Sequence, residues 1–257
     1  GAGSLADYLK SFAVTSSVMQ SEAALARIAR EFVIDASRDG VIYAETRWAP
    51  LAHLRNNLTP REVVDAVQRG LTEGMAIVAE TGPAIYVRQI LTALRHETNS
   101  YEVATLALDC ADLGVVGFDL AGPEYGFPPS LHKKALDLLS REGLSVTIHA
   151  GEAAGPESVL EAIQDGYARR IGHGVRIAED IRVRNAEMEL GPLASLVRDS
   201  GVTLELAPRS NLQTESSLVF GPTLSDHPFD LLYKWGFSVT VNPDNRLMSD
   251  STVTGEL

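Results

Sequence analysis

The chain has 257 residues, of which 45% are hydrophobic and 22% are charged, a composition that is ordinary for a globular protein with one sizeable core. The formal net charge is -12 and no cluster of lysine and arginine stands out, so we expect neither nucleic acid nor an anionic membrane surface as a partner. No apolar run approaches the length of a membrane-spanning helix.

The first predicted elements are helices. Apolar residues recur at helical spacing in three segments that end in glycine: residues 21–40, 59–82 and 99–114. The second of these helices is expected to begin with Thr59 as N-cap, Pro60 at the first helical position and Glu62 at the capping-box position. The third is predicted to repeat this arrangement with Asn99 and Glu102.

Short segments rich in β-branched residues follow these and later glycines and are predicted to be buried strands. They are residues 41–46, 83–91, 115–120, 144–149, 167–174, 202–208 and 237–243. Alternating helices and buried strands indicate a parallel sheet covered by helices. Seven strands at this spacing favour a (β/α)8 TIM barrel that lacks one strand over a doubly wound sheet. No linker divides the single expected domain, residues 1–257.

Polar residues stand where several predicted strands end. His149 and Glu152 follow one strand, His173 ends the next between two glycines, and Asp244 follows the last. The carboxyl ends of strands carry the chemistry of (β/α)8 barrels. Each residue alone would be a structural or turn residue, but two histidines and two carboxylates on one rim form a ligand set for zinc or a similar divalent ion. The neighbouring glycines would let a substrate or metal approach the backbone closely.

Other candidate residues are predicted to be structural. Cys110 lies in an apolar helical pattern and should be a buried thiol, which suits a cytoplasmic protein without disulfides. His227 precedes Pro228 at an expected helix start, where a capping role is predicted. The chain contains no P-loop and no dinucleotide fingerprint, and Ser210 does not lie in a nucleophile elbow.

The motifs at these strand ends resemble those of the adenosine deaminase family. "DLAGPE", "HAGE", "GHG", "LAPRSNLQT" and "VTVNPDN" occur in the order and spacing of that family, and "YAETRWAP" resembles its second strand. The likeness covers nearly the whole chain. It implies a zinc-dependent (β/α)8 barrel that hydrolyses the 6-amino group of adenosine or deoxyadenosine to give inosine or deoxyinosine and ammonia, as in purine salvage.

The resemblance also implies roles for particular residues. His149 resembles a zinc ligand, and Asp244 resembles the final zinc ligand, which also contacts the metal-bound water. Glu152 resembles the acid that protonates purine N1. His173 resembles the residue that orients and deprotonates the water. Gly122 resembles the position whose backbone N–H meets purine N3.

Elementary chemistry agrees with these roles. C6 of adenine is a poor electrophile, and protonating N1 withdraws electron density from it. Zinc lowers the pKa of a bound water to roughly 7. Glu152 must hold a proton when the substrate binds, so we expect burial to raise its pKa.

Two departures from the family pattern bear on function. The family begins with a strand carrying H-x-H, which supplies two zinc ligands, and this sequence contains no H-x-H. The chain is therefore interpreted as incomplete at both ends, with two further histidine ligands expected from a first strand. The final motif reads Pro243, Asp244 and Asn245, where Asn245 replaces an Asp that donates to purine N7. An amide donates at any pH, so this change is compatible with activity.

Alternative functions stay open at this point. A sister deaminase would act on adenine, on an aminodeoxyfutalosine-type nucleoside or on AMP, although the strand ends offer only Arg209 and Arg246 to bind a phosphate. A non-catalytic barrel that binds nucleosides is the alternative from another class. The retention of all four residues argues against it: His149, Glu152, His173 and Asp244.

Overall fold

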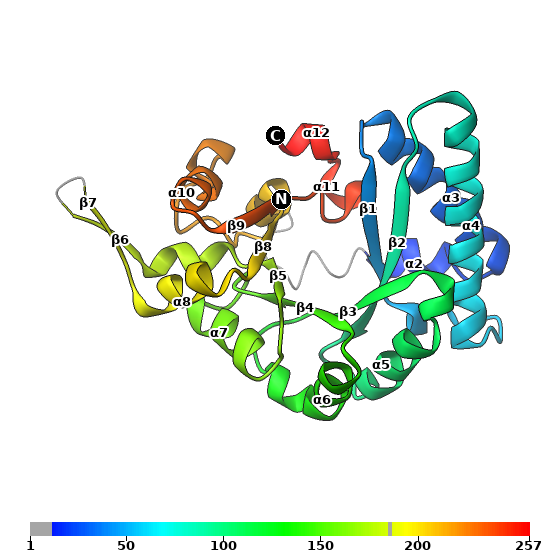
Figure 1. Cartoon of the computed structure of the whole chain (residues 1–257), viewed down its shortest axis with the longest axis horizontal. Coiled ribbons are helices and arrows are strands. Elements are labelled where there is room, and N and C mark those ends of the chain that lie inside the picture. Colours follow the sequence, from blue (N-terminus) through cyan, green and yellow to red (C-terminus); the bar gives the residue numbers. More distant parts are fainter. Residues whose placement is uncertain (1–11, 185–186) are drawn as a thin grey trace.

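Seven parallel strands form one curled sheet with helices on its outer side (Figure 1). The computed structural model describes residues 12–184 and 187–257. The predicted domain also takes in residues 1–11 and 185–186, which lie outside the described residues. Neighbouring strands follow the order β1 (Tyr43–Trp48), β2 (Tyr86–Leu94), β3 (Val115–Ala121), β4 (Ser145–Ala150), β5 (Arg170–His173), β8 (Thr203–Leu206) and β9 (Ser238–Val241).

All seven predicted strands are confirmed as members of this sheet, with bounds that differ by a few residues at their ends. Their predicted burial is wrong for β1 and β9, the two edge strands, whose residues are half-buried or exposed. The sequence analysis missed the antiparallel hairpin of β6 (Ile181–Arg184) and β7 (Glu187–Leu190), which forms a separate two-stranded sheet. The seven parallel strands form a partial barrel of the predicted TIM type. Within the described residues, β1 and β9 are its two edges.

Helices lie between successive parallel strands, before β1 and after β9. They are α2 (Phe12–Val18), α3 (Glu22–Arg38), α4 (Pro60–Thr81), α5 (Ser100–Asp109), α6 (Lys133–Glu142), α7 (Pro156–Gln164), α8 (Pro192–Ser200), α9 (Pro208–Gln213), α10 (Phe229–Lys234), α11 (Arg246–Ser249) and α12 (Val253–Glu256). Short 3-10 turns cover residues 50–53, 111–113, 129–132, 175–180 and 224–226. None of the helices in the described ranges is long and apolar enough to cross a membrane.

Local capping chemistry explains several helix ends. The predicted capping box of α4 is confirmed, because Thr59 accepts the backbone N–H of Glu62 and the side chain of Glu62 accepts the N–H of Thr59. The predicted box of α5 is wrong: Asn99 is the N-cap, but its amide donates to Glu97 at 2.6 Å and makes no capping bond. At the C-cap of α6, Gly143 adopts the left-handed conformation that glycine accommodates without strain.

The core lies between the sheet and its helices. Helices α3 and α4 pack tightly because Gly70 and Gly74 of α4 lack side chains; a Cβ at Gly70 would lie 2.1 Å from the carbonyl oxygen of Ala26. The predicted burial of Cys110 is confirmed, since its thiol lies in the cluster formed with the middle strands. This packing fixes the sheet and thereby the directions in which the strand ends point.

The curl of the sheet brings distant strands face to face in its interior. Arg47 of β1 contacts Glu205 of β8, with 2.7 Å between Nη1 and Oε2. Arg170 of β5 binds the other oxygen of Glu205 at 2.9 Å and Glu45 of β1 at 2.6 Å. These ion pairs are partly buried and charge-balanced, so they link β1 to β8 across the inside of the partial barrel.

Candidate active site

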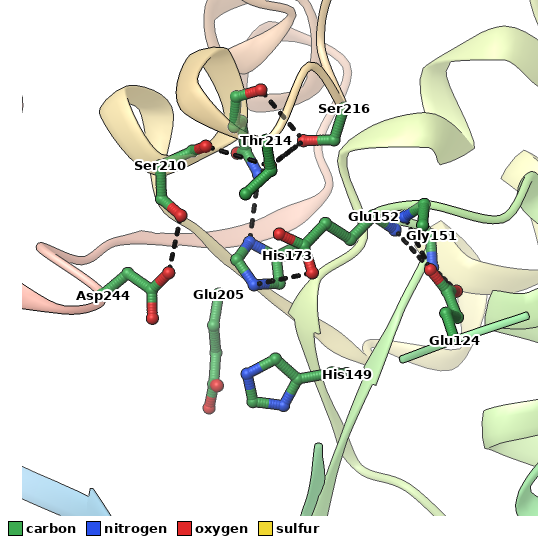
Figure 2. Close-up of polar contacts among 12 residues, drawn as sticks. Glu124, His149, Gly151, Glu152, His173, Glu205, Ser210, Thr214, Ser216 and Asp244 are labelled. Carbon is green, nitrogen blue, oxygen red and sulfur yellow. Dashed lines mark hydrogen bonds and ion pairs between the residues drawn. The ribbon is translucent and has the colours of Figure 1, made fainter. Parts of the chain in front are cut away.

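Strand ends from β3, β4, β5 and β9 place the predicted site residues at one end of the sheet (Figure 2). The rings of His149 and His173 lie edge to face with 5.2 Å between their centroids. Nε2 of His173 lies 3.6 Å from Oε2 of Glu152. Asp244 lies on the far side of His173 from Glu124 and interacts electrostatically with both histidines. The structure thus brings together the four residues that the sequence singled out.

The imidazole of His149 is held by a buried carboxylate. Nδ1 of His149 lies 2.9 Å from Oδ1 of Asp119, and the hydroxyl of Thr92 donates to the other oxygen of Asp119 at 3.0 Å. Burial opposes the charge on both groups, but their mutual attraction outweighs it, so the pKa of His149 is raised and the pKa of Asp119 is lowered. His149 therefore donates from Nδ1, which leaves Nε2 to face a ligand.

Two site residues have left-handed backbone conformations. The φ angles are 66° at His173 and 46° at Asp244, which is uncommon for residues other than glycine. Ser210 donates its hydroxyl to Oδ2 of Asp244 at 2.6 Å. Burial alone would raise the pKa of Asp244, but the nearby His173 and the bond from Ser210 hold that pKa below its ordinary value. The left-handed backbone of His173 and Asp244 is strained, and such strain is retained at functional sites when the surrounding structure enforces it.

Glu152 is buried, with 5% of its surface exposed. Burial raises the pKa of its carboxyl, an effect that the neighbouring His173 opposes and the charge of Asp244 reinforces. The direction matches the expectation from the sequence that Glu152 holds a proton when a substrate arrives. A carboxyl group with this pKa shift is suited to general acid catalysis.

The glycine that precedes His173 has a use that differs from the prediction. A Cβ at Gly172 would lie 3.0 Å from the ring of His149, so the space beside Gly172 is filled by His149 and not by a substrate or metal. Gly122 follows β3 with a φ angle of 110°, a conformation that L side chains rarely adopt.

Asn245 caps α11 by accepting the N–H of Met248 on its Oδ1 at 3.1 Å. This bond leaves the amide nitrogen of Asn245 as the donor that the sequence analysis expected.

Glu124 organises the loop that carries Glu152, and the sequence analysis did not assign it a role. Its carboxylate accepts the backbone N–H groups of four consecutive residues, 151–154, at distances from 2.7 to 3.2 Å, and also the hydroxyl of Ser158. Figure 2 shows the carboxylate of Glu124 beside the backbone of Gly151 and Glu152. Four converging N–H groups form an anion-binding concavity of the backbone, filled here by a side chain. The motif "DLAGPE" ends in Glu124, so the sequence analysis included this residue in a family motif. The motif alone did not indicate which groups the carboxylate of Glu124 binds.

A buried cation fixes the strand just before this loop. Arg95 is 1% exposed and donates to the carbonyl oxygens of His149 at 2.8 Å and Phe127 at 2.7 Å. The attraction of Glu124 for Arg95 is among the charge interactions that oppose the effect of burial on the pKa of Arg95. One buried cation and one buried anion therefore hold the two halves of the turn between His149 and Glu152.

Replacing Glu124 by glutamine is expected to lower the free energy of unfolding by about 3 kcal/mol, because the amide turns an NH2 group toward backbone donors and leaves some of them unpaired. Ser158→Ala is the matched control, since it removes one donor and keeps the carboxylate, and should cost about 1 kcal/mol. Urea denaturation of the three proteins measures both values. A Glu124→Gln protein as stable as the wild type would show that the loop does not depend on this carboxylate.

The donor chemistry of two residues fits a metal ion. His149 offers Nε2 while a carboxylate holds its Nδ1, the arrangement usual for metal-binding histidines. Asp244 offers the oxygen that Ser210 does not engage. Among residues 12–184 and 187–257, no group of three or more His, Cys, Asp and Glu residues is arranged to hold a metal. His149 and Asp244 are therefore the two donors with this chemistry that the described part of the chain offers to a metal ion.

Comparison with known proteins agrees with the motifs and the geometry. A family model for adenosine deaminase matches residues 1–257. The chain belongs to the adenosine deaminase family. It is 48% identical over 255 residues to adenosine deaminase 1 of Streptomyces coelicolor, covering 99% of this chain and 63% of the relative. It is 48% identical over 256 residues to adenosine deaminase of Mycobacteroides abscessus, covering 99% of this chain and 70% of the relative. The chain thus spans less than two thirds of the length of the first of these relatives.

Solved structures with the same fold include other deaminases. The chain superposes on an N6-methyl-AMP deaminase of Arabidopsis thaliana with a TM-score of 0.81 at 25% identity, covering 98% of this chain and 71% of that one. Adenine deaminase of Arthrobacter aurescens gives a TM-score of 0.82 at 24% identity, covering 97% and 71%. A zinc-bound amidohydrolase of Burkholderia ambifaria gives 0.74 at 21% identity, covering 92% and 62%. The last two likenesses bear on the fold alone.

Proposed function

We propose that the protein to which this chain belongs is a zinc-dependent adenosine deaminase that converts adenosine and deoxyadenosine to inosine and deoxyinosine with release of ammonia. The observation that carries the proposal is the buried Glu152 beside His173 at strand ends that also present His149 and Asp244. The 48% identity to two adenosine deaminases supports adenosine as the substrate.

In the proposed mechanism each residue acts on a particular atom of the purine or on the attacking water. Glu152 donates a proton to purine N1 as water adds at C6, and burial favours the protonated form of Glu152 by raising its pKa. His173 orients the attacking water. The backbone N–H of Gly122 binds purine N3, and the amide of Asn245 donates to N7. Zinc, when bound by His149, Asp244 and further ligands, supplies a water of lowered pKa.

A nucleotide monophosphate is a poorer candidate because the arginines near the strand ends are engaged within the chain. Arg209 donates to the carbonyl oxygen of Gly255 at 3.1 Å and lies 3.8 Å from Glu256. Arg246 lies 3.9 Å from Asp35 and over the ring of Phe32. A phosphate would have to displace these contacts. A cytoplasmic location is part of the proposal, since the single thiol is free and buried.

The test is an assay of the protein expressed from its complete reading frame. Adenosine should be deaminated with a higher kcat/KM than adenine, AMP or N6-methyl-AMP, and a chelator should abolish the activity until zinc is restored. Preference for adenine or for a nucleotide would identify a sister deaminase. Nucleoside binding without turnover would identify a non-catalytic barrel, and turnover that survives complete removal of metal would contradict the zinc dependence.

A further inference from the structure

A buried line of hydrogen bonds runs from the start of α10 to His173. The backbone N–H of Phe229 donates to Nδ1 of His227 at 3.2 Å, so the predicted capping role of His227 is confirmed. Nε2 of His227 lies 3.1 Å from Oδ1 of Asn211, and Nδ2 of Asn211 lies 3.0 Å from Nδ1 of His173. Asn211 is fully buried, and 2% of His173 and 7% of His227 are exposed. We call these four residues the Asn211 relay.

The direction of each bond in the Asn211 relay follows from its first donor. A backbone N–H can only donate, so Nδ1 of His227 must accept. A neutral imidazole that accepts on one nitrogen carries its proton on the other, so Nε2 of His227 donates to Asn211. Burial lowers the pKa of His227 to about 4, so its ring is neutral at pH 7.

A second set of contacts fixes the orientation of the Asn211 amide independently. The hydroxyl of Ser216 donates to the backbone carbonyl oxygen of Asn211 at 3.1 Å, so its oxygen is left to accept the Asn211 amide N–H, also at 3.1 Å. Both His227 and Ser216 therefore require the nitrogen of the amide to face His173. Figure 2 shows Ser216 and Thr214 above His173, with Glu152 beside its other edge.

We propose that Asn211, oriented by His227 and Ser216, is a positioning residue that holds His173 in the tautomer with its proton on Nε2. Because Nδ2 of Asn211 donates, Nδ1 of His173 must accept. The nitrogen that faces Oε2 of Glu152 at 3.6 Å is then an N–H group. His173 presents a hydrogen-bond donor to the site.

This tautomer separates the two roles that the resemblance implied for His173. A neutral ring with its proton on Nε2 has no lone pair on that nitrogen, so it can orient an oxygen by donating to it but cannot take a proton there. The inference rests on the proposed function only for what His173 does to the water. The hydrogen bonds that set the tautomer lie within this chain and involve no substrate or metal.

Nuclear magnetic resonance of the protein from its complete reading frame, labelled with 15N-histidine, tests the proposal, because ring 15N shifts distinguish protonated from unprotonated nitrogens. Spectra are recorded at pH 8, where histidine is ordinarily neutral. Two buried histidines serve as internal standards. His53 faces the carbonyl oxygen of Met19 with Nδ1, and His132 faces the carbonyl oxygen of Arg95 with Nε2, so they represent the two tautomers. The signals that vanish in His173→Gln identify His173.

In the wild type we expect His173 to show the pattern of His132, with Nδ1 unprotonated. Asn211→Asp is close to isosteric but places an acceptor opposite Nδ1, so Nδ1 of His173 should become protonated while His53 and His132 are unchanged. A wild-type His173 with the pattern of His53, or an Asn211→Asp protein whose Nδ1 stays unprotonated, would overturn the proposal. If Asn211→Asp does not fold, the wild-type spectrum alone still decides. Since no substrate is present, loss of the proposed deaminase activity would leave this result unaffected.

Discussion

Glu152→Gln is expected to lower kcat for adenosine by about 100-fold or more while leaving zinc bound. The amide keeps the size and hydrogen-bonding capacity of the side chain, but it is a poor proton donor to purine N1. The loop position is preserved, because Glu124 binds the backbone of residues 151–154 and not the side chain of Glu152. The loss should therefore lie in kcat, with a small change in KM.

The matched control for this variant is Glu157→Gln, an identical substitution at an exposed position in the first turn of the neighbouring α7. It should retain wild-type kinetics. Steady-state assays of the protein from its complete reading frame, with zinc content measured by mass spectrometry, separate lost chemistry from lost metal. A Glu152→Gln enzyme with near wild-type kcat would show that another group protonates the purine.

Features of the fold that depend on neighbouring residues were predictable from the sequence. The capping box of Thr59 and Glu62 spans one helical turn, and the buried strands have short apolar runs with glycines before them. The same local reasoning was wrong at Asn99, where Glu97 competes for the side chain that would have capped α5. The hairpin of β6 and β7 was missed because its strands have four residues each and carry no apolar run.

The candidate site was predictable to the extent that topology alone places strand ends on one rim. His149, Glu152, His173 and Asp244 belong to that group, and the structure brings them together. The residues that position them bind partners far away in sequence, which no local pattern encodes. Glu124 accepts donors 27 to 34 residues later, and Asn211 donates to a ring 38 residues earlier.

Asp119 is the remaining positioning residue, and Asp119→Ala is expected to weaken zinc binding by about 10- to 100-fold, as loss of a carboxylate behind a metal-binding histidine usually does. Without the carboxylate, Nδ1–H of His149 is left buried without its partner, and the ring can turn or change tautomer. Competition with a chromophoric chelator, using the protein from its complete reading frame, measures the change in zinc affinity.

Thr92→Val is the control that distinguishes the effect of the contact between Asp119 and His149 from the effect of the surrounding packing. It removes the hydroxyl that donates to the second oxygen of Asp119 but leaves the bond between Asp119 and His149 in place. Zinc affinity in Thr92→Val should fall much less than in Asp119→Ala. Equal losses in the two variants would mean that packing around β2 and β3, and not the contact between Asp119 and His149, sets the affinity. An unchanged zinc affinity in Asp119→Ala would mean that His149 is not a zinc ligand held through its Nδ1. An imidazole that nothing holds loses conformational freedom when the metal binds, and this loss weakens the affinity.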